Sequence, residues 1–410
     1  MSDPTNNNHA AQVQEGWIRA PLGRFLTPNV ESVEVNPERM YPTVGVLNRG
    51  RGLLYRDPVA GSSTSYKTLN RIGPGVLVYS RLKAFEGAIT VTPNDLPESF
   101  ASQEFPTFAF ASDADPDFFR ILTTTQYIWD ALQVASKGMG GRRERVKPAD
   151  FLNIVMDIPP LSMQERIVEV IGVVDDQITA LDGEAKAAEM VAGAIAESML
   201  ANHAYVRIGN HLDRIEGGRS PQAIDKPPTE DEEGVLKVSA VVAFQFIADE
   251  SKALAPGTEM PESAEVQAGD VLVTRASGAI HRVGAVCRVP SDVRGGLYLS
   301  DKTLRMVPAD GLDPDFLVVA MALSGVRRQI TTAASGSASM KNISQSKIAG
   351  LEVPMPELTE QRKVASTVLS MRALGCACRA EANSLRQVRA ALLSGLLDRT
   401  IAIDSAKLEV

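Results

Sequence analysis

The chain contains an internal duplication with a period of about 197 residues, and this feature constrains its fold more than any other. Asp115–Phe119 (DPDFF) falls on Asp313–Leu317 (DPDFL), and Val78–Arg81 (VYSR) falls on Leu272–Arg275 (LVTR). Solenoid repeats are only about 20–50 residues long, so a repeat of this length indicates a duplicated domain rather than an array of small units.

Each copy follows the same order along the chain. Roughly 140–150 residues of strand-rich sequence come first, with short β-branched runs such as Gly75–Tyr79 and Asp270–Thr274. A proline-rich stop follows, at Ile158–Leu161 in the first copy and at Val353–Pro356 in the second. After each stop the pattern predicts the start of a long helix.

The expected helix starts carry capping signals. Ser162 and Thr359 are the expected N-caps, because their hydroxyls can accept hydrogen bonds from the first free backbone N–H groups. Glu165 stands at the third position after Ser162, where a capping box places its acidic residue. We therefore expect each helix to begin directly after its capping residue.

Apolar residues recur at alternating spacings of three and four through both expected helices. Sustained over about four heptads, this spacing is typical of a coiled-coil seam. Gly375 and Arg389 interrupt the second seam and predict a kink or a polar contact, whereas the alanine-rich middle of the first helix would allow close approach. The seam residues are Ile171, Val174, Ile178, Leu181 and Ile195 in the first helix and Val368, Met371, Leu385, Leu392 and Leu396 in the second.

The net charge of −8 is concentrated in the first of these helices. Residues 162–201 hold two basic and eight acidic side chains, whereas residues 359–399 hold seven basic and three acidic ones. Opposite charge beside matching seams favours pairing of the two helices with each other, and antiparallel pairing suits a duplicated chain. A helix of roughly 39 residues is about 58 Å long, so the pair would form a rigid spacer.

These patterns predict an α+β fold with two homologous mixed α/β domains separated by two long antiparallel coiled-coil helices, pseudo-two-fold symmetric. The expected segments in chain order are a flexible N-terminus (1–14), the first domain (15–157), the first long helix (158–202), the second domain (203–353), the second long helix (354–400) and a C-terminal tail (401–410).

Residue patterns typical of catalysis or metal binding are sparse. The four histidines lie at no metal-ligand spacing with a cysteine or with one another, and three cysteines cannot build a four-ligand zinc site. No phosphate-binding glycine loop followed by Lys-Ser/Thr is present, and no Gly-x-Ser-x-Gly elbow. We therefore expect a chain without enzyme activity, metal or cofactor.

The sequence also favours a cytoplasmic location. No run of about 18 or more apolar residues is present, so we expect no helix that spans a membrane and no membrane partner. The polar segment at 1–14 lacks the basic-then-apolar pattern of a signal peptide.

Basic residues are grouped in loops of both copies. A glycine-rich run at 138–141 leads into a basic loop, and small polar residues at 335–342 stand at the matching place of the second copy. Lys and Arg neutralise phosphates, whereas Arg, Lys, Asn and Gln read base edges; scattered surface arginines are the alternative interpretation. The predicted nucleic-acid contacts are Arg81, Arg142, Arg143, Arg145 and Lys147 in the first copy and Arg219, Arg275, Arg282, Arg294, Lys341 and Asn342 in the second.

A proline-rich stop, then Leu-x-Glu-Gln-x-x-Val, then a long helix, written twice behind variable domains, resembles the specificity subunit of type I restriction–modification systems. Leu358–Val364 (LTEQRKV) carries the motif in the second copy, and Leu161–Ile167 (LSMQERI) departs from it at Met163, where Glu is usual. Gly217–Pro221 (GGRSP) resembles the Gly-Gly-Thr-Pro turn of that family. The resemblance extends over nearly the whole chain.

The resemblance implies that each domain is a target-recognition domain that reads one half of a split double-stranded DNA sequence. It also implies that the paired helices set the gap between the halves and dock methyltransferase (M) subunits, which bind S-adenosylmethionine. A separate restriction (R) subunit would cleave the DNA. The chain itself would then be the non-catalytic specificity subunit.

Three other functions stay open from the sequence. One is a protein-interaction scaffold whose duplicated domains bind proteins, with the coiled coil as a spacer. The others are a DNA reader of a related defence system and an enzyme whose site is too dispersed to recognise. Loss of a bipartite methylated DNA motif with loss of the gene would favour the specificity subunit over the scaffold.

Overall fold

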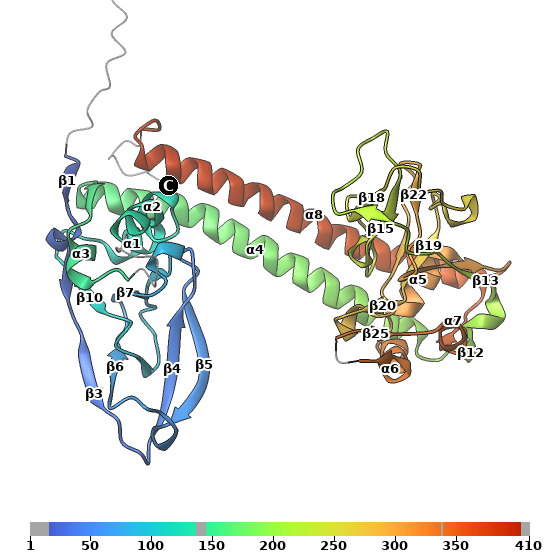
Figure 1. Ribbon diagram of the computed structural model, residues 1–410, viewed down its shortest axis with the longest axis horizontal. Helices are drawn as coiled ribbons and strands as arrows, with labels where there is room; N and C mark the ends of the chain where they lie inside the picture. The colour runs from blue at the N-terminus through green and yellow to red at the C-terminus, as the bar shows by residue number, and fades with distance from the viewer. Residues whose placement is uncertain (1–15, 137–144, 338, 403–410) are drawn as a thin grey trace, which may run out of the picture. The chain divides into compact units, whose positions relative to one another are not determined.

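The computed structural model describes residues 16–136, 145–337 and 339–402 of the chain. The chain divides into two compact units: unit 1 comprises Met1–Thr179 and Ala382–Val410, and unit 2 comprises Ala180–Glu381. Each unit contains one strand-rich lobe, called lobe 1 and lobe 2 below, and about half of each of two long helices (Figure 1). The predicted flexible N-terminus and most of the predicted C-terminal tail lie outside the described residues.

Lobe 1 is built on a frame of two antiparallel sheets and three short helices. Four strands pair in the order β2-β10-β7-β8, and β1 pairs with β11 in a separate two-stranded sheet. Asp115 begins the first helix as its N-cap, because its carboxylate accepts a hydrogen bond from the backbone N–H of Asp117. The frame elements are β1 (Ile18–Pro21), β2 (Leu26–Pro28), β7 (Leu77–Tyr79), β8 (Ile89–Val91), β10 (Thr107–Phe110), α1 (Pro116–Leu122), α2 (Gln126–Ala135), α3 (Pro148–Leu152) and β11 (Val155–Ile158).

Lobe 2 repeats this frame. Four antiparallel strands pair in the order β13-β23-β19-β21, β12 pairs with β26, and Asp313 caps the first helix as Asp115 does in lobe 1. The elements are β12 (Tyr205–Arg207), β13 (Leu212–Gly217), β19 (Val271–Thr274), β21 (Val286–Arg288), β23 (Thr303–Pro308), α5 (Pro314–Ala322), α6 (Ser324–Ala333), α7 (Gln345–Ala349) and β26 (Glu352–Pro354). The common strand order confirms that the two lobes are homologous, as the duplication predicts.

The strands inserted into the two frames differ. Lobe 1 carries a five-stranded sheet in the order β3-β6-β9-β4-β5, which lies at the end of the lobe away from the long helices (Figure 1). Lobe 2 instead carries a four-stranded sheet (β14-β18-β15-β22), the hairpin β16-β17 and the small sheet β20-β25-β24. The bounds are β3 (Glu31–Glu34), β4 (Met40–Val46), β5 (Leu53–Ala60), β6 (Thr68–Ile72) and β9 (Ser99–Ala101) in lobe 1, and β14 (Ala223–Ile224), β15 (Gly234–Leu236), β16 (Val241–Val242), β17 (Gln245–Phe246), β18 (Ser251–Leu254), β20 (Ala276–Ser277), β22 (Leu297–Tyr298), β24 (Ser335–Gly336) and β25 (Lys341–Asn342) in lobe 2.

Both predicted long helices are present, α4 (Leu161–Leu200) and α8 (Leu358–Leu397), with 40 residues each. The predicted N-caps are wrong, because Ser162 and Thr359 lie inside the first turn. In α4, the backbone N–H groups of Met163 and Gln164 donate to the carbonyl of Pro160. In α8, those of Glu360 and Gln361 donate to the carbonyl of Glu357. The cap positions are therefore held by Pro160 and Glu357, because a residue at the cap must supply its carbonyl to the first turn but needs no helical N–H bond of its own.

The two helices run antiparallel to each other within each unit. In unit 1, the guanidinium of Arg389 on α8 forms two hydrogen bonds of 2.5 and 2.9 Å with the carboxylate of Asp175 on α4. In unit 2, Glu189 on α4 pairs with Arg379 and lies 3.8 Å from Arg372 on α8. Basic side chains of α8 thus meet acidic ones of α4, as the opposite helix charges predict, and Arg389 makes a polar contact.

The seam between the helices is closely packed. All ten seam residues named from the sequence are buried or half-buried, and the buried positions near the end of α4 shift to Ala196 and Leu200, which pack into the lobe 2 core. Such a shift follows from the mismatch between 3.6 residues per turn and a 3.5-residue repeat. A Cβ on Gly375 would stand 3.2 Å from the carbonyl oxygen of Ala185 and 3.4 Å from the Cβ of Ala188, so this glycine permits close backbone approach rather than a kink.

Candidate nucleic-acid interface

Each lobe is fixed to its long helix by one buried glutamine. Gln164 on α4 accepts a hydrogen bond from the backbone N–H of Asp115 (2.8 Å). Its amide nitrogen donates to the carbonyls of Asp113 (3.1 Å) and Pro159 (2.9 Å). Because the side chain is fully buried and all three partners are backbone groups, it holds the start of α1 against the start of α4.

Gln361 on α8 repeats this joint in lobe 2. It accepts from the backbone N–H of Asp313 (2.9 Å) and donates to the carbonyls of Gly311 (3.0 Å) and Pro356 (2.9 Å). The two repeated sequence motifs, one at the start of the short helix and one at the start of the long helix, therefore contact each other. Each lobe is therefore attached to a long helix by the same glutamine contact, called the mounting below.

An arginine stands at the end of the same frame strand in each lobe. In lobe 1, the N–H of Arg81 donates to the carbonyl of Glu104 (2.9 Å), and its carbonyl accepts from the N–H of Val146 (3.1 Å). In lobe 2, Arg275 makes the matching bonds, to the carbonyl of Lys302 (2.8 Å) and from the N–H of Ile343 (2.9 Å).

The side chains around these two arginines differ. In lobe 1, Glu104 lies 3.2 Å from a guanidinium nitrogen of Arg145 and 4.0 Å from one of Arg81, so one carboxylate faces two guanidiniums. In lobe 2, the guanidinium of Arg275 donates to the backbone carbonyl of Asp301 (3.3 Å), while the carboxylate of Asp301 accepts from the hydroxyl of Ser220. Arg275 is exposed.

The other predicted contact residues differ in exposure and in whether their side chains already form hydrogen bonds. Lys147 and Arg282 are exposed, and Asn342 is half-buried in β25. Arg219 donates to the carbonyl of Glu259, and the ammonium of Lys341 donates to that of Gly336 (3.1 Å).

Arg294 differs from these residues because its guanidinium is engaged inside lobe 2. It donates to the carbonyls of Thr229 (2.7 Å), Gly295 (3.2 Å) and Glu232. Arg142 and Arg143 lie outside the described residues.

Two acidic residues at these sites were not identified from the sequence. Glu104 and Asp301 precede the last strand of each frame sheet and are 197 residues apart, the same spacing as the helix motifs. The two arginines are 194 residues apart, so acid and arginine do not repeat at one spacing, and no clear signal in the sequence marks the pairing.

A buried arginine inside lobe 2 was also not identified from the sequence, because its partners are distant along the chain. Arg305 on β23 donates to the carboxylates of Asp270 and Glu216, at 2.8 Å each, and to the carbonyls of Ser263 (3.1 Å) and Glu265. Burial raises the pKa of Asp270, whereas the hydrogen bond from Arg214 lowers the pKa of Glu216. A charge buried this deeply fastens the insert to the frame.

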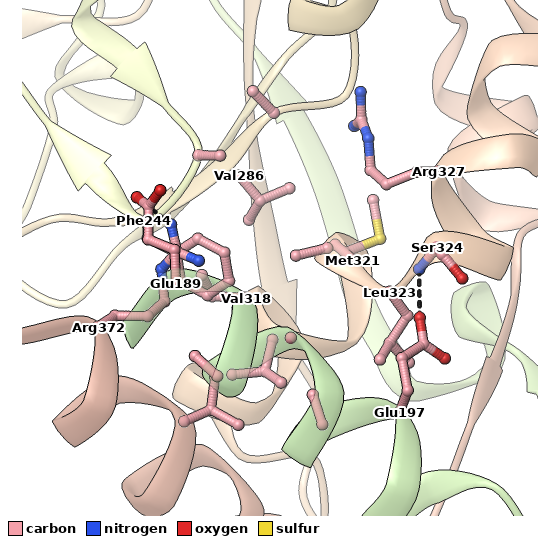
Figure 2. Close-up of a pocket in the computed structure, with 18 of the residues that line it drawn as sticks. Glu189, Glu197, Phe244, Val286, Val318, Met321, Leu323, Ser324, Arg327 and Arg372 are labelled. Carbon is pink, nitrogen blue, oxygen red and sulfur yellow. Dashed lines mark hydrogen bonds and ion pairs between the residues drawn. The ribbon is translucent and has the colours of Figure 1, made fainter. Parts of the chain in front are cut away.

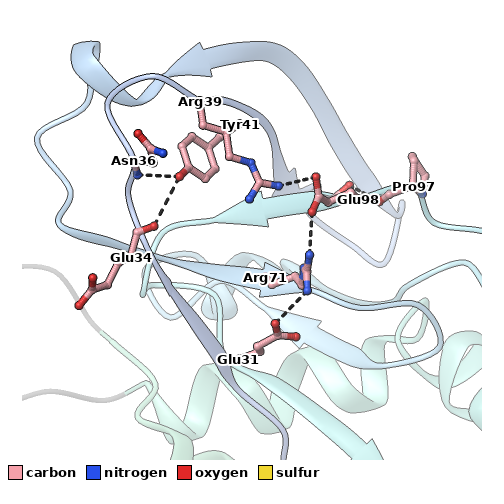
Figure 3. Close-up of polar contacts among 9 residues, drawn as sticks. Glu31, Glu34, Asn36, Arg39, Tyr41, Arg71, Pro97 and Glu98 are labelled. Atoms are coloured by element: carbon pink, nitrogen blue, oxygen red, sulfur yellow. Dashed lines mark hydrogen bonds and ion pairs between the residues drawn. The ribbon is translucent and has the colours of Figure 1, made fainter.

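The five-stranded sheet of lobe 1 carries an exposed chain of ion pairs (Figure 3). Glu98 accepts from Arg39 and Arg71 at 2.7 Å each, and Arg71 also pairs with Glu31 at 3.0 Å. Hydrogen bonds from the two arginines lower the pKa of Glu98, and those to Glu98 and Glu31 raise the pKa of Arg71. The guanidiniums of Arg39 and Arg71 are therefore both paired with carboxylates.

Each unit also has an apolar cavity beside its long helices. In unit 2 a cavity of about 600 Å³ lies between α4 and the junction of α5 and α6, with Arg372 stacked on the ring of Phe244 at 3.7 Å (Figure 2). The carboxylate of Glu197 accepts from the N–H of Ser324 (2.6 Å) at its rim. In unit 1 a cavity of about 710 Å³ lies between α8 and the start of α2, beside Trp129.

Neither metal ligation nor a membrane segment is supported by the described parts of the chain. Within 16–136, 145–337 and 339–402, no three His, Cys, Asp or Glu residues gather as metal ligands would. Over the same residues, no helix combines the length and the apolar character needed to cross a bilayer.

Comparison with known proteins supports the sequence resemblance. No protein-family model matches the chain. Over 201 residues it is 31% identical to the type I restriction enzyme EcoEI specificity subunit of Escherichia coli, a match that covers 48% of the chain and 33% of that curated relative. In sequence, the chain therefore resembles type I specificity subunits.

Two solved structures share the fold. One is the type I restriction–modification S subunit from M. genitalium, with a TM-score of 0.54 at 12% identity over 98% of each chain. The other comes from work on complex assembly and conformational transition of the type I R-M system, with a TM-score of 0.56 at 17% identity over 94% of this chain and 99% of that one. The resemblance predicted from the doubled motif is thus confirmed.

Proposed function

We propose that the chain is the DNA sequence-specificity subunit of a type I restriction–modification complex, in which each lobe reads one half of a bipartite double-stranded target. The observation that carries the proposal is the pair of lobes with one common frame, one common mounting and two different inserts. A protein that reads two unlike half-sites needs this combination, because the mounting must be the same while the reading surfaces differ.

The charges at the strand ends support DNA as the ligand. Arg81 and Arg275 occupy equivalent frame positions, and Arg145, Lys147 and Arg282 are exposed. Guanidinium groups match the acceptor edge of guanine, and lysines neutralise phosphates. The acidic net charge of −8 fits a subunit that relies on its partners for much of its non-specific DNA affinity.

The partners in this proposal are methyltransferase (M) subunits and a restriction (R) subunit. The M subunits would bind S-adenosylmethionine, so the chain itself would be non-catalytic and would act in the cytoplasm. The cavity beside the long helices in each unit offers an apolar surface for docking them. The two cavities lie at corresponding corners of the two copies, next to α6 in unit 2 and α2 in unit 1.

The long helices would set the gap between the half-sites. A helix of 40 residues is about 60 Å long at about 1.5 Å per residue. One turn of DNA is about 34 Å long, so such a spacer fits half-sites roughly one to two turns apart.

Mapping of modified bases in cells with and without the gene tests the proposal. The expected result is loss of one methylated motif, made of two short defined stretches with a fixed undefined gap, when the gene is removed. The proposal would be contradicted if the complex assembles in cells with the gene but removing the gene leaves the methylation pattern unchanged. That outcome would favour the protein-interaction scaffold, which the two apolar cavities also fit.

A further inference from the structure

In lobe 1, the carboxylate of Glu104 faces the strand-end arginine at a distance of 4.0 Å. Resting on the function proposed above, we infer that Arg81 reads a guanine in the half-site of lobe 1 and that Glu104 is the positioning residue that orients it. The backbone at Arg81, the charges around it and the comparison with lobe 2 each support this assignment.

The backbone of Arg81 is fixed on both sides. Its N–H and its carbonyl are both hydrogen-bonded, to Glu104 and Val146. Two residues earlier, the hydroxyl of the buried Tyr79 donates to the carbonyl of the same Val146 (3.1 Å). A side chain that discriminates between bases must start from a rigid Cα, and this crossing of three segments supplies one.

The charges around Arg81 are incompletely paired. Glu104 gives one carboxylate oxygen to Arg145 at 3.2 Å, and its other oxygen lies 4.0 Å from Arg81, beyond hydrogen-bond distance. That oxygen and the Nε of Arg81 are buried without a hydrogen-bond partner among the described residues. Among the described residues, two guanidiniums share this carboxylate, so these three side chains together carry one net positive charge, and Arg81, 26% exposed, keeps unused donors.

A guanine edge fits the unused donors of Arg81. Guanine presents two acceptors, O6 and N7, side by side in the major groove, and a guanidinium offers two parallel donors at the matching spacing. A phosphate would also accept from an arginine, but it needs no carboxylate to orient the side chain, since any approach of the positive charge suffices. The positioning carboxylate therefore favours base reading over phosphate neutralisation.

In lobe 2, the strand-end arginine is oriented by a backbone carbonyl instead of a carboxylate. Arg275 has the same backbone bonds, but its guanidinium is held by the backbone carbonyl of Asp301, whose carboxylate accepts from Ser220 instead. Only lobe 1 therefore depends on a carboxylate to orient its strand-end arginine. Loss of that carboxylate should affect one half of the target and leave the other half unchanged.

The test uses the complete methylation complex in cells, with modified bases mapped genome-wide. Glu104→Gln keeps the shape of the side chain and removes its charge, and Arg81→Lys keeps the positive charge and removes the paired donors. Both are expected to lower the preference for guanine at one position of the lobe 1 half by about 5- to 150-fold, with the lobe 2 half unchanged. Asp113→Asn is the matched control, because Asp113 also pairs with an arginine of lobe 1, Arg24 at 2.8 Å, but both side chains are exposed and neither lies beside Arg81 or on the insert.

The outcomes separate this inference from the proposed function. A wild-type complex without a bipartite motif overturns both, whereas a wild-type motif that neither variant changes overturns only the role of Arg81 and Glu104. Relaxation at a position that is not guanine, or equal relaxation by Asp113→Asn, also overturns the role of Arg81 and Glu104. If a variant complex assembles but methylates nothing, its affinity is measured for DNA duplexes that carry each of the four bases at each target position. A flattened guanine preference supports the inference, and an equal loss for all duplexes contradicts it.

Discussion

Lobe 1 and lobe 2 share a frame and a mounting but fill them differently. The frame strands have one order in both lobes, and Gln164 and Gln361 make the same three hydrogen bonds. The inserts have different numbers and orders of strands. What repeats is the part that attaches each lobe to the long helices, and what differs is the part that, on the proposed function, offers two unlike surfaces to DNA.

The cores of the two lobes differ in the type of apolar side chain at corresponding positions. Lobe 1 packs three rings, Tyr79, Phe108 and Phe151, with centroids 4.7 to 6.0 Å apart. The corresponding positions of lobe 2 hold aliphatic residues of its core, among them Met306 and Ile348. Buried apolar volume is thus kept while its chemistry changes, as expected where only packing is required.

The inserts are also fastened to the frames by different means. Lobe 2 uses the buried guanidinium of Arg305, whereas at the corresponding strand position lobe 1 has Thr107, whose hydroxyl donates to the carbonyl of Asn29. A buried charge needs several fixed partners, but a hydroxyl needs one. The predictions below test how far this difference between the lobes extends.

The largest effect is expected from removing the buried charge of lobe 2. Arg305→Met leaves the carboxylates of Asp270 and Glu216 without their shared partner, so we expect a loss of about 3–5 kcal/mol in local stability. Hydrogen exchange of lobe 2 amides measures it. Arg288→Met is the control, because the Arg288–Asp315 pair is exposed and should contribute about 0–1 kcal/mol. Equal losses for the two variants would contradict the role of Arg305.

The second effect tests whether the mountings are equivalent. Gln164→Leu and Gln361→Leu each leave buried backbone groups without a partner, which should cost about 1–3 kcal/mol. Because the geometry is the same, hydrogen exchange at the starts of α1 and α5 should increase by similar factors in the two variants. A loss in one lobe only would show that the joints are not alike.

An effect of similar size is expected at the close approach of the helices in unit 2. Gly375→Val would push against Ala185 and Ala188 and should cost about 1–3 kcal/mol of helix-pair stability. Gly183→Val is the control, because a Cβ there meets nothing within 4 Å among the described atoms. Thermal unfolding followed by circular dichroism compares them, and equal melting temperatures would contradict the close approach.

The smallest effect is expected in the exposed ion pairs of lobe 1. The pKa of Glu98 is lowered below its usual 4.5, so its contribution to stability is present above pH 4.5 and is lost as the pH falls through the lower folded-state value. Solvent screening keeps the contribution small and sensitive to salt. Glu98→Gln should therefore flatten the stability of lobe 1 between pH 5 and pH 3 (roughly the range of carboxylate titration). The same slope in the wild type and the variant would contradict this.

The sequence predicts the duplication and the long helices because both depend on local patterns. Spacing along one helix fixes which residues form its seam, and Ile171, Leu181 and Val368 are buried accordingly. Both helix starts were placed two residues too late, because Pro160 and Glu357 hold the cap positions rather than Ser162 and Thr359. The inserts could not be predicted, because their strands pair across long stretches of chain, as β3 does with β6 and β6 with β9.

The candidate site was predictable only in part. Arg81 and Arg275 stand out because they end a repeated strand motif, but their acidic neighbours lie more than 20 residues away and meet them only in the folded lobe. The partners that engage Arg294 are likewise distant in sequence. Which arginines are free depends on tertiary contacts, and no spacing rule records those.

The central claim is that each lobe reads its own half of the target, and lobe replacement tests it most directly. The measurement is the methylated motif written by a complex whose chain carries residues 203–353 in place of residues 15–157. We expect the half read by lobe 1 to disappear and the half read by lobe 2 to occur at both ends of the motif, with the gap unchanged. An unaltered motif, written by a complex that assembles and methylates, would contradict it.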